Sequence, residues 1–588
     1  MSRHWPQLLM ILAVALFAAA PLLVGGYALT LMNYMGIGAL VALGLVLLTG
    51  VGGMTSFGQA AFVGIAAYAT AWVTTIEGGS PWLGLVLALV LTGGTATVLG
   101  LATLRLSGHF LPVSTIAWGI AIYYVFGNLD VMGRYNGVSN IPPVALGALS
   151  LTSTSAGYYL IWLPLGLAMF LCGNLLDSRE GRAVRSLRGG PAMAESLGID
   201  TLRVRLKVFI VAALLAGLAG WLYAHVQRYI APGAFDIQPG IEYLLMALLG
   251  GAGHIAGAVV GAIVVTLLKD LLQDVLPALT RNSAQLEIVV FGALMIVILQ
   301  QARGGIVPFL QRHLPRGAPP AIGEAPALPR RTPPEAGAPL LAVERASRHF
   351  DGLIAVNAVG FELNAGEILG LIGPNGAGKS TMFNLITGVL KPNGGRIRFL
   401  GEDITGARAR HIAARGIART FQHVKLRPTM TLLENTMLGV YLRTRAGMLA
   451  GALRLDREEE RSARGEAMRQ LRRVGLADKA YELAGNLPLG QQRILEVARA
   501  LAADPVLIIL DEPAAGLHGQ EKTNLAALLR ELRAEGMTIL LVEHDMDFVM
   551  GLVDRIVVMD FGAKLAEGLP AEIRADPRVQ EAYLGGVA

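Results

Sequence analysis

Hydrophobic and polar positions divide the chain into two halves of different pattern. In the first half, long apolar runs follow one another with few charges between them. Runs of this length and apolarity are typical of helices that cross a bilayer. Eight of them are expected at residues 34–50, 59–76, 82–104, 110–128, 157–174, 208–226, 255–273 and 286–302.

Two further runs bear on the number of crossings. The run from Gln7 to Gly26, preceded by Arg3 and His4, could be a secretory signal peptide, but further apolar runs follow at once, so we interpret it as a retained first span. A shorter run, Ile241 to Leu249, ends in glycines and predicts a half-span or a kinked crossing. Counting both, we expect about ten spans.

Charge predicts how the spans are oriented. The loop 175–207 is rich in arginine and is therefore expected on the cytoplasmic side. If the half of the chain that follows the spans is also cytosolic, about ten crossings with a cytoplasmic N-terminus satisfy both conditions. Within this loop, Pro191 and Gly198 bracket a short predicted helix, which could dock a cytosolic domain or simply belong to an ordinary basic loop.

Few polar residues interrupt the apolar half. Gln59 is one, and we interpret it as a helix-start cap within closely packed small residues rather than as a functional group. Asp130, Arg134, Asp236 and Glu242 are expected in external loops, where they could meet a partner or be solvated. Cys172 lies in an apolar run and is expected to be a core residue.

A proline-rich stretch separates the halves. Residues 303–338 are expected to form an extended, semi-rigid linker, because proline at this density disfavours helix and sheet. This gives a membrane domain at 1–302 and a second domain at 339–588, in which alternating and short apolar runs predict an α/β fold.

The second domain contains a phosphate-binding pattern. Gly373-Pro374-Asn375-Gly376-Ala377-Gly378-Lys379-Ser380-Thr381 fits G-x-x-x-x-G-K-[ST], and it lies between a predicted buried strand, Ile368–Ile372, and a predicted helix. Backbone N–H groups of such a loop and the following helix N-terminus converge on phosphate. Lys379 would supply positive charge and the Ser380 hydroxyl a ligand for Mg²⁺.

Two more apolar strands end in residues suited to phosphoryl transfer. One delivers Asp511 and Glu512, which we expect to hold Mg²⁺ and to activate water, respectively. The other is followed by His544, expected to contact the γ-phosphate. ATP and Mg²⁺ are therefore the predicted cofactors.

Composition agrees with a membrane protein that carries a soluble domain. Hydrophobic residues make up 53 % and charged residues 16 % of the chain, and the mean hydropathy is +0.53. The net charge of +6 is attributed to basic cytoplasmic loops rather than to nucleic-acid binding.

Several motifs together resemble the ATP-binding-cassette ATPases. Gln422 matches the Q-loop glutamine, which the resemblance makes a catalytic residue and a further Mg²⁺ ligand. Phe350 matches the aromatic that stacks on adenine, and His544 matches the switch histidine, which the resemblance makes catalytic together with Glu512. The signature, which completes a partner's ATP site, falls at Leu487, Gly490 and Gln491, but Pro488 and Leu489 replace its usual serine and glycine. His518 stands where an aspartate is usual, so communication between the two ATP sites is in doubt.

The resemblance narrows to importers of branched-chain amino acids. RHFDGLIAV, the charged insert at 456–473 and the C-terminal segment resemble one ATPase of these systems, and LTGVGGMTSFGQAAFVGIAAY resembles one permease. The resemblance implies a permease–ATPase fusion in a bacterial inner membrane, working with a second permease, a second ATPase and an extracytoplasmic solute-binding protein. The solute stays open: branched-chain amino acids, other amino acids, amides or urea.

Two other functions compete with import. An exporter half-transporter also joins a membrane domain to a cassette, but it usually has six long spans. A mechanical or signalling ATPase that moves no solute usually carries large external domains, which the short loops here do not provide.

Overall fold

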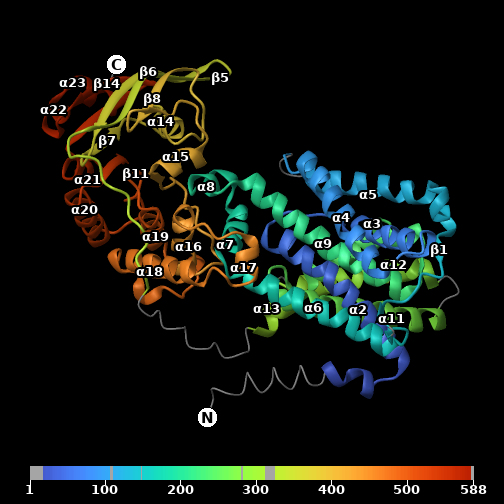
Figure 1. The fold of residues 1–588 in the computed structure, drawn as a ribbon. Coiled ribbons are helices and arrows are strands. Elements are labelled where there is room, and N and C mark those ends of the chain that lie inside the picture. The colour runs from blue at the N-terminus through green and yellow to red at the C-terminus, as the bar shows by residue number, and fades with distance from the viewer. Residues whose placement is uncertain are drawn as a thin grey trace, which may run out of the picture. The chain divides into compact units, whose positions relative to one another are not determined.

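The computed structural model describes residues 17–105, 110–147, 149–279, 283–302, 304–311 and 325–584. The chain forms two compact units (Figure 1). The helical unit comprises residues 1–176 and 202–317, and the sheet unit comprises residues 177–201 and 318–588. The predicted cytoplasmic loop thus belongs to the same unit as the phosphate loop.

Eight helices of the described helical unit are long and apolar enough to cross a membrane, which confirms the predicted polytopic domain. They span Gly26–Val51, Gln59–Ile76, Pro81–Thr103, Phe110–Asn128, Thr154–Leu176, Thr201–Gln227, Ile255–Pro277 and Leu286–Gln311. In Figure 1 these begin with α2, α3, α4, α5, α6, α9, α11 and α12. The first predicted run, Gln7–Gly26, lies largely outside the described residues. The short predicted run is part of α10, Ile237–Gly251.

Small strands accompany these helices outside the apolar spans. They are β1 (Val138–Ser139), which pairs with β4 (Tyr229–Ile230), and β2 (Ala145–Leu146), which pairs with β3 (Leu149–Ser150). The helical unit is therefore almost, but not entirely, all-α. Cys172 is buried within α6, as predicted.

Two helix breaks in this unit pack against each other. The first separates the π-helical turn Val46–Val51 from α3, Gln59–Ala71, and the second separates α10 from α11, Ile255–Leu279. A side chain at Gly50 would lie 2.6 Å from the Gly253 backbone nitrogen, so the two breaks approach too closely for any larger residue. Gln59 starts α3 and is 1 % exposed, but its side chain caps nothing: within the described structure neither of its polar atoms has a partner.

Glu242 corrects an expectation, because it lies within α10 rather than in an external loop. The Asp236 carboxylate accepts a hydrogen bond from the Ile237 N–H, so the helix starts at Ile237, ahead of the apolar run that begins at Ile241. Lys269 of α11 donates to both Glu242 carboxylate oxygens at 2.9 Å. An ion pair between two apolar helices meets the requirement that charge in such a setting find a partner.

The sheet unit is built on a six-stranded sheet in the order β10-β11-β12-β7-β13-β14. The first five strands run parallel, and β14 is antiparallel to β13. Because β7, β11 and β12 are neighbours and parallel, their carboxyl ends lie together at one edge. The six strands are β7 (Ile368–Ile372), β10 (Ile417–Arg419), β11 (Leu507–Asp511), β12 (Thr538–Val542), β13 (Arg555–Asp560) and β14 (Ala563–Gly568).

A second, antiparallel sheet has the order β6-β5-β8-β9. Its strands are β5 (Pro339–Phe350), β6 (Leu353–Asn364), β8 (Gly394–Phe399) and β9 (Glu402–Asp403). Residues of α14, such as Phe383, share a core with this sheet and with one face of the parallel sheet, while Leu529 of α20 belongs to the core on the other face. The α/β fold predicted for this half is confirmed.

Some helices of the sheet unit, such as α14 and α20, pack on the sheets. Others, such as α16 and α18, share a core of their own. The longer ones are α7 (Arg179–Ser186), α14 (Lys379–Ile386), α15 (Ala409–Arg415), α16 (Leu432–Gly439), α18 (Arg457–Arg473), α19 (Leu489–Ala502), α20 (Gly519–Ala534) and α23 (Pro577–Leu584). The shorter ones are α8 (Pro191–Ser196), α17 (Met448–Ala452), α21 (Met546–Met550) and α22 (Pro570–Ala575).

The predicted linker departs from a free tether in two places. Residues Ile306–Gln311 form helix α13 because their apolar sequence precedes the proline-rich part. Farther along, Leu328 is buried in the core that contains α16 and α18. Arg331 donates from its backbone N–H to the Asp504 carboxylate at 2.6 Å and from its guanidinium to the Ala414 carbonyl at 3.1 Å. The end of the linker is therefore packed on the sheet unit.

A candidate ATP site and a docking segment

The phosphate loop follows β7 and leads into α14. Gly373, Gly376 and Gly378 have φ values of +151°, +85° and +96°, in the region that favours glycine. A Cβ at Gly373 would come within 2.1 Å of the Met559 carbonyl oxygen, so backbone crowding also requires glycine there. Within this compact loop the Ala377 N–H donates to the Pro374 carbonyl at 3.2 Å, and the overall geometry is that of a loop whose other N–H groups can face an anion.

Lys379 spans the loop. Its ammonium group donates to the carbonyl oxygens of Gly373 and Pro374 at 2.7 and 2.8 Å. Burial lowers the pKa of Lys379, and the nearby Glu512 and Asp511 carboxylates oppose that shift. The remaining predicted loop residues vary in exposure: Asn375 and Ser380 are exposed, Thr381 is half-buried, and Ala377 is buried.

Asp511 lies at the end of β11, next to the strand that carries the loop. It is 2 % exposed; Oδ2 is 3.5 Å from the Arg419 guanidinium, and Oδ1 is buried without a partner in the described structure. Burial raises the pKa of Asp511, and Arg419 opposes this shift. An orphaned carboxylate oxygen beside a phosphate loop fits a hydrated Mg²⁺ ion.

Glu512 brings together the three residues predicted to be catalytic. Its Oε1 accepts a hydrogen bond from Gln422 Nε2 at 3.0 Å and lies 2.8 Å from His544 Nε2. The backbone of Glu512 has φ = +50°, a conformation that non-glycine residues rarely adopt. Its N–H donates to the Val542 carbonyl at 2.9 Å, so β12 helps to hold this turn in place.

Two arginines that the sequence did not point to organise this cluster. Arg493 of α19 donates to the carbonyl oxygens of Glu512 and Gln422 at 2.7 and 3.1 Å. Arg419 of β10 donates to Asn384 Oδ1 at 2.6 Å and to Thr387 Oγ1 at 2.9 Å, besides its contact with Asp511. Each arginine joins segments far apart in the sequence, so no local pattern identifies it.

The residues predicted to contact adenine and to form the signature do not contact Glu512 in the interactions described above. The Phe350 ring is 38 % exposed, and the Arg348 guanidinium lies 4.6 Å from its centroid. Leu489 is 55 % exposed at the start of α19, whereas Leu487 and Gly490 are buried. Gln491 accepts a hydrogen bond from Lys479 at 2.9 Å.

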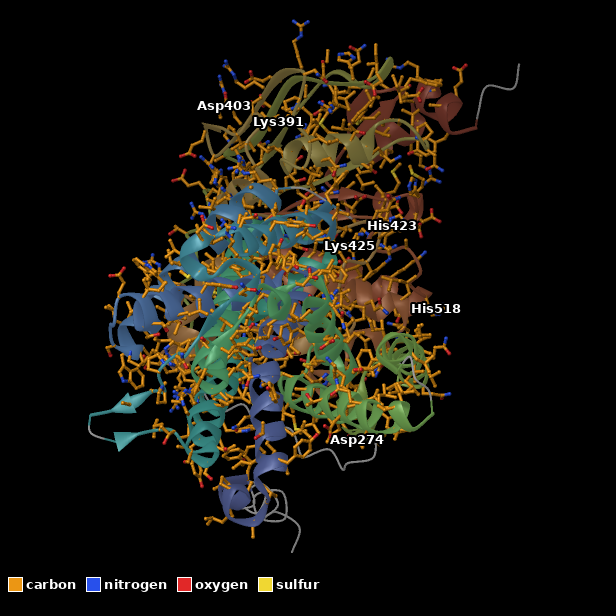
Figure 2. All side chains as sticks on the ribbon, turned by 90° about the vertical axis from the view of Figure 1, so that its right-hand side faces the viewer. Asp274, Lys391, Asp403, His423, Lys425 and His518 are labelled. Atoms are coloured by element: carbon orange, nitrogen blue, oxygen red, sulfur yellow. The ribbon has the colours of Figure 1, made fainter. Side chains whose placement is uncertain are left out.

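His518 has a structural place at the start of α20. It is the residue before the first turn, and its side chain is labelled in Figure 2. Its backbone N–H donates to the Glu521 carboxylate at 3.0 Å. Among the described residues no group of three or more His, Cys, Asp or Glu side chains could hold a metal ion by itself. A metal ion here would therefore need phosphate oxygens and water among its ligands.

Comparison with known proteins identifies both halves of the chain. The family described as the permease component of the branched-chain amino acid transport system matches residues 27–299. The ABC transporter family matches 356–515, and the branched-chain amino acid ATP-binding cassette transporter family matches 563–588. The high-affinity branched-chain amino acid transport ATP-binding protein LivG of Salmonella typhimurium is 46 % identical over 250 residues, which are 42 % of this chain and 98 % of LivG.

The chain belongs to the branched-chain amino acid family of ATP-binding cassette transporters. BraF of Pseudomonas aeruginosa, with the same description as LivG, is 44 % identical over 250 residues, 42 % of this chain and 98 % of that protein. A probable branched-chain amino acid transport ATP-binding protein of Archaeoglobus fulgidus is 37 % identical over 246 residues, which are 42 % of this chain and 95 % of that protein. This chain thus joins a permease domain to a transport ATPase, and each of the three relatives named here is a transport ATP-binding protein that matches 42 % of the chain.

The sheet unit of this transporter contains residues 177–201, which follow membrane helix α6 and are called the docking segment after the role proposed for them below. Arg182 of α7 makes two hydrogen bonds with Glu460 of α18, at 2.8 and 2.7 Å, and the two side chains are 6 % and 13 % exposed. Arg185 donates to Glu434 at 2.6 Å. Burial opposes ionisation of Glu434, but Arg185 and the Thr431 hydrogen bonds outweigh it and lower its pKa.

The short helix predicted in this segment is α8, which begins at Pro191 and is followed by Gly198 at φ = +82°. The neighbouring helix α7 was not predicted, because four of the eight residues in its sequence, REGRAVRS, are charged and only Ala183 and Val184 are apolar. Arg179 of α7 stacks on the Tyr441 ring, 3.7 Å from its centroid. The basic loop is therefore a folded element of the sheet unit.

Proposed function

We propose that this chain is the permease–ATPase component of an importer that couples ATP hydrolysis to uptake of branched-chain amino acids. The observation that carries the proposal is the presence, on one chain, of a permease domain and a cassette that each match the branched-chain family. LivG and BraF, named for branched-chain amino acid transport, support the solute class.

The residues around the phosphate loop fit a nucleotide with Mg²⁺. Ser380, Gln422 and Asp511 would hold the metal, which neutralises developing phosphate charge when bound. Phe350 offers an aromatic face to adenine, and Gly373–Thr381 offers N–H groups to the phosphates. Leu487, Gly490 and Gln491 would face the nucleotide of a second cassette.

The catalytic roles follow from the contacts of Glu512. As a carboxylate it can accept a proton from the attacking water and so act as general base. Gln422 and His544 both contact Oε1, so they orient the carboxylate before water arrives. Arg493 fixes the backbone at both Glu512 and Gln422 and is a positioning residue.

The docking segment supports coupling between hydrolysis and transport. It follows α6 directly and leads into α9, so any movement of the sheet unit at 177–201 is transmitted to two membrane helices. A nucleotide does useful work only if it binds one conformation of the transporter better than another. The altered signature predicts that the two ATP sites of the assembled transporter differ in activity.

The complete transporter is proposed to lie in a bacterial inner membrane with its cassettes in the cytoplasm. It would include a second permease, a second ATPase and a solute-binding protein on the opposite side, with lipid around the apolar helices. The exporter alternative is disfavoured by the match to an importer permease over residues 27–299. The same match disfavours an ATPase that moves no solute.

Uptake into membrane vesicles that contain the complete transporter tests this proposal. Labelled leucine should accumulate only with ATP and the solute-binding protein, and unlabelled isoleucine and valine should compete. Glutamine and urea in equal excess are the controls. Strong competition by urea or glutamine, with none by isoleucine or valine, would assign a different solute; ATP-driven export of leucine would overturn import.

A further inference from the structure

Glu543, the residue before His544, is an acidic side chain buried next to the candidate ATP site. It directly follows β12 and is 3 % exposed. Burial raises the pKa of this carboxyl group, and the hydrogen bonds that it accepts from the backbone oppose the shift. Because a carboxylate is rarely buried so completely without partners, the contacts of Glu543 indicate what it does.

Both oxygens of Glu543 accept hydrogen bonds from backbone N–H groups. Oε1 accepts from the Ala514 N–H at 2.5 Å, and Oε2 accepts from the N–H of the next residue, His544, at 3.1 Å. Ala514 lies two residues after Glu512, with Pro513 between them. One carboxylate therefore joins the turn that carries the proposed base to the loop that carries the proposed histidine.

The turn that begins at Glu512 needs such support. Its positive φ is a conformation that costs free energy and persists only where the surrounding structure holds it. The Glu512 N–H donates to the carbonyl of Val542, the last residue of β12, at 2.9 Å. Pro513 has no N–H, so the next donor is that of Ala514, and Glu543 accepts it. Two consecutive residues, Val542 and Glu543, thus hold the two sides of the turn.

The other acidic neighbour of His544 is bonded elsewhere. Asp545 Oδ1 accepts a hydrogen bond from a backbone N–H of α21 at 3.1 Å, and its Oδ2 accepts one from Lys522 of α20 at 2.6 Å. These bonds fix the far side of the histidine loop. Of the two acidic residues that flank His544, Glu543 is the one bonded to the Glu512 turn.

Exposure separates the role of Glu543 from that of Glu512. The Glu512 side chain is 14 % exposed, and its Oε1 contacts both Gln422 and His544, so it lies among the groups proposed to act on water. The Glu543 carboxylate is enclosed, and its two oxygens are bonded to the backbone. A side chain in this position holds other residues in place rather than meeting water or phosphate itself.

We propose that Glu543 is a positioning residue for ATP hydrolysis, which holds the Glu512 turn and the His544 loop so that Glu512 Oε1 meets His544 Nε2. These two atoms are 2.8 Å apart. The inference rests on the catalytic roles proposed above for Glu512 and His544. Positioning of this kind matters for rate, because a misplacement of about 1 Å can cost about 10²-fold.

The test measures steady-state ATP hydrolysis by the complete transporter with Glu543→Gln. The amide has the size of the carboxylate, but an NH₂ donor replaces one acceptor oxygen, so one of the two backbone N–H groups loses its acceptor. We expect kcat to fall about tenfold or more, because the base and the histidine are no longer held together. KM for ATP should stay within about twofold of the wild-type value, since the phosphate loop is unchanged.

Glu367→Gln is the matched control. The Glu367 carboxylate also accepts a hydrogen bond from a backbone N–H, that of Asn364 at 3.0 Å, but it precedes the amino end of β7, whereas the ATP site lies at the carboxyl ends of the strands. Its kcat should equal that of the wild type. Glu543→Asp serves if the amide variant does not fold: it keeps both acceptors on a side chain one methylene shorter, and kcat should fall by a smaller factor.

A double substitution distinguishes positioning from a general loss of stability. If Glu543 acts through Glu512, adding Glu543→Gln to Glu512→Gln should change the residual single-turnover hydrolysis by less than about twofold. A general loss of stability would lower hydrolysis by the same factor in both backgrounds.

The outcomes separate this inference from the proposed catalytic roles. A lower kcat at unchanged KM, present in the wild-type background and absent in Glu512→Gln, supports positioning by Glu543. Wild-type kcat in Glu543→Gln overturns it, as does an equal loss in both backgrounds; wild-type kcat in Glu543→Asp overturns it if the amide variant does not fold. Hydrolysis at the wild-type rate in Glu512→Gln alone would overturn the proposed base, and the role of Glu543 with it.

Discussion

Two buried polar side chains, Asp511 of the candidate ATP site and Gln59 of the membrane helices, differ in whether they have a side-chain partner. Around the phosphate loop, buried charges meet partners: Asp511 meets Arg419, and Glu496 meets Arg499 at 2.9 Å. In the described helical unit, Gln59 is equally buried, but both of its polar atoms lack partners. The first arrangement is typical of a site that is preorganised before its ligand binds.

The second arrangement costs stability. An unsatisfied buried amide costs about 1–3 kcal/mol, so evolution retains it only where it has another use. Gln59 starts α3 directly after a break in the helix, and non-helical backbone within a membrane domain typically lines a cavity or a path. The comparison teaches that charged groups find partners in both units, as in Asp511–Arg419 and Glu242–Lys269, whereas the neutral amide of Gln59 has none in the described structure.

The largest effect is expected at Glu512. Glu512→Gln keeps the shape but removes the base, so ATP hydrolysis by the complete transporter should fall about 10²- to 10⁴-fold while ATP binding persists. Glu531→Gln is the control, because that side chain is 62 % exposed and lies 3.5 Å from its arginine partner. Hydrolysis at the wild-type rate in Glu512→Gln would show that Glu512 is not the general base.

The Arg419–Asp511 pair tests whether pairing stabilises the site. Arg419→Met leaves a buried carboxylate without its cation and should lower the free energy of unfolding of the sheet unit by about 3–5 kcal/mol, with weaker Mg²⁺ binding. In the control, Arg396→Met, a pair that is 53 % exposed on both sides is lost, and the expected change is about 0–1 kcal/mol. Denaturant titration of the full chain measures both, and equal effects would contradict the argument from burial.

The third prediction concerns the docking segment, where Arg182 forms an ion pair with Glu460, a residue distant in the sequence. Arg182→Glu should strongly reduce the stimulation of ATP hydrolysis by the solute-loaded binding protein, and adding Glu460→Arg should restore part of it. Arg464→Ala is the control, since its pair with Asp177 is exposed and 3.5 Å long. If the charge reversal at Glu460 restored nothing, the ion pair would not carry the coupling.

The smallest stability effect, and one of opposite sign, is expected at Gln59. Gln59→Met removes an unsatisfied amide at similar volume and should leave thermal stability unchanged or raise it by about 1–3 kcal/mol. Uptake should nevertheless fall if the amide serves the path. A loss of stability like that of Arg419→Met would show that Gln59 has partners and would break the comparison.

The sequence predicted the elements of the ATP site better than their contacts. Gly373–Thr381, Asp511 and His544 follow apolar strands, and parallel strands bring their carboxyl ends together, so local pattern sufficed. Arg419 and Arg493 escaped notice because their partners are distant in sequence. Glu496 and Arg499 escaped for another reason: charged residues are normally expected outside a core.

The membrane half was predictable in its spans but not in its details. Hydropathy located eight helices, yet it placed Glu242 in a loop because a charge next to a short apolar run resembles a helix end. The start of α10 depends on the Asp236 cap. Glu242 is paired with Lys269, which belongs to another helix, so no pattern within α10 reveals the pair.

The central claim is that hydrolysis in this cassette drives leucine uptake. Its most direct test is to record leucine uptake and ATP hydrolysis together in proteoliposomes containing the complete transporter, with wild-type chain and with Glu512→Gln. The account predicts that uptake in the wild type requires ATP and that both activities collapse together in the variant. Uptake that persists in Glu512→Gln while hydrolysis is lost would contradict it.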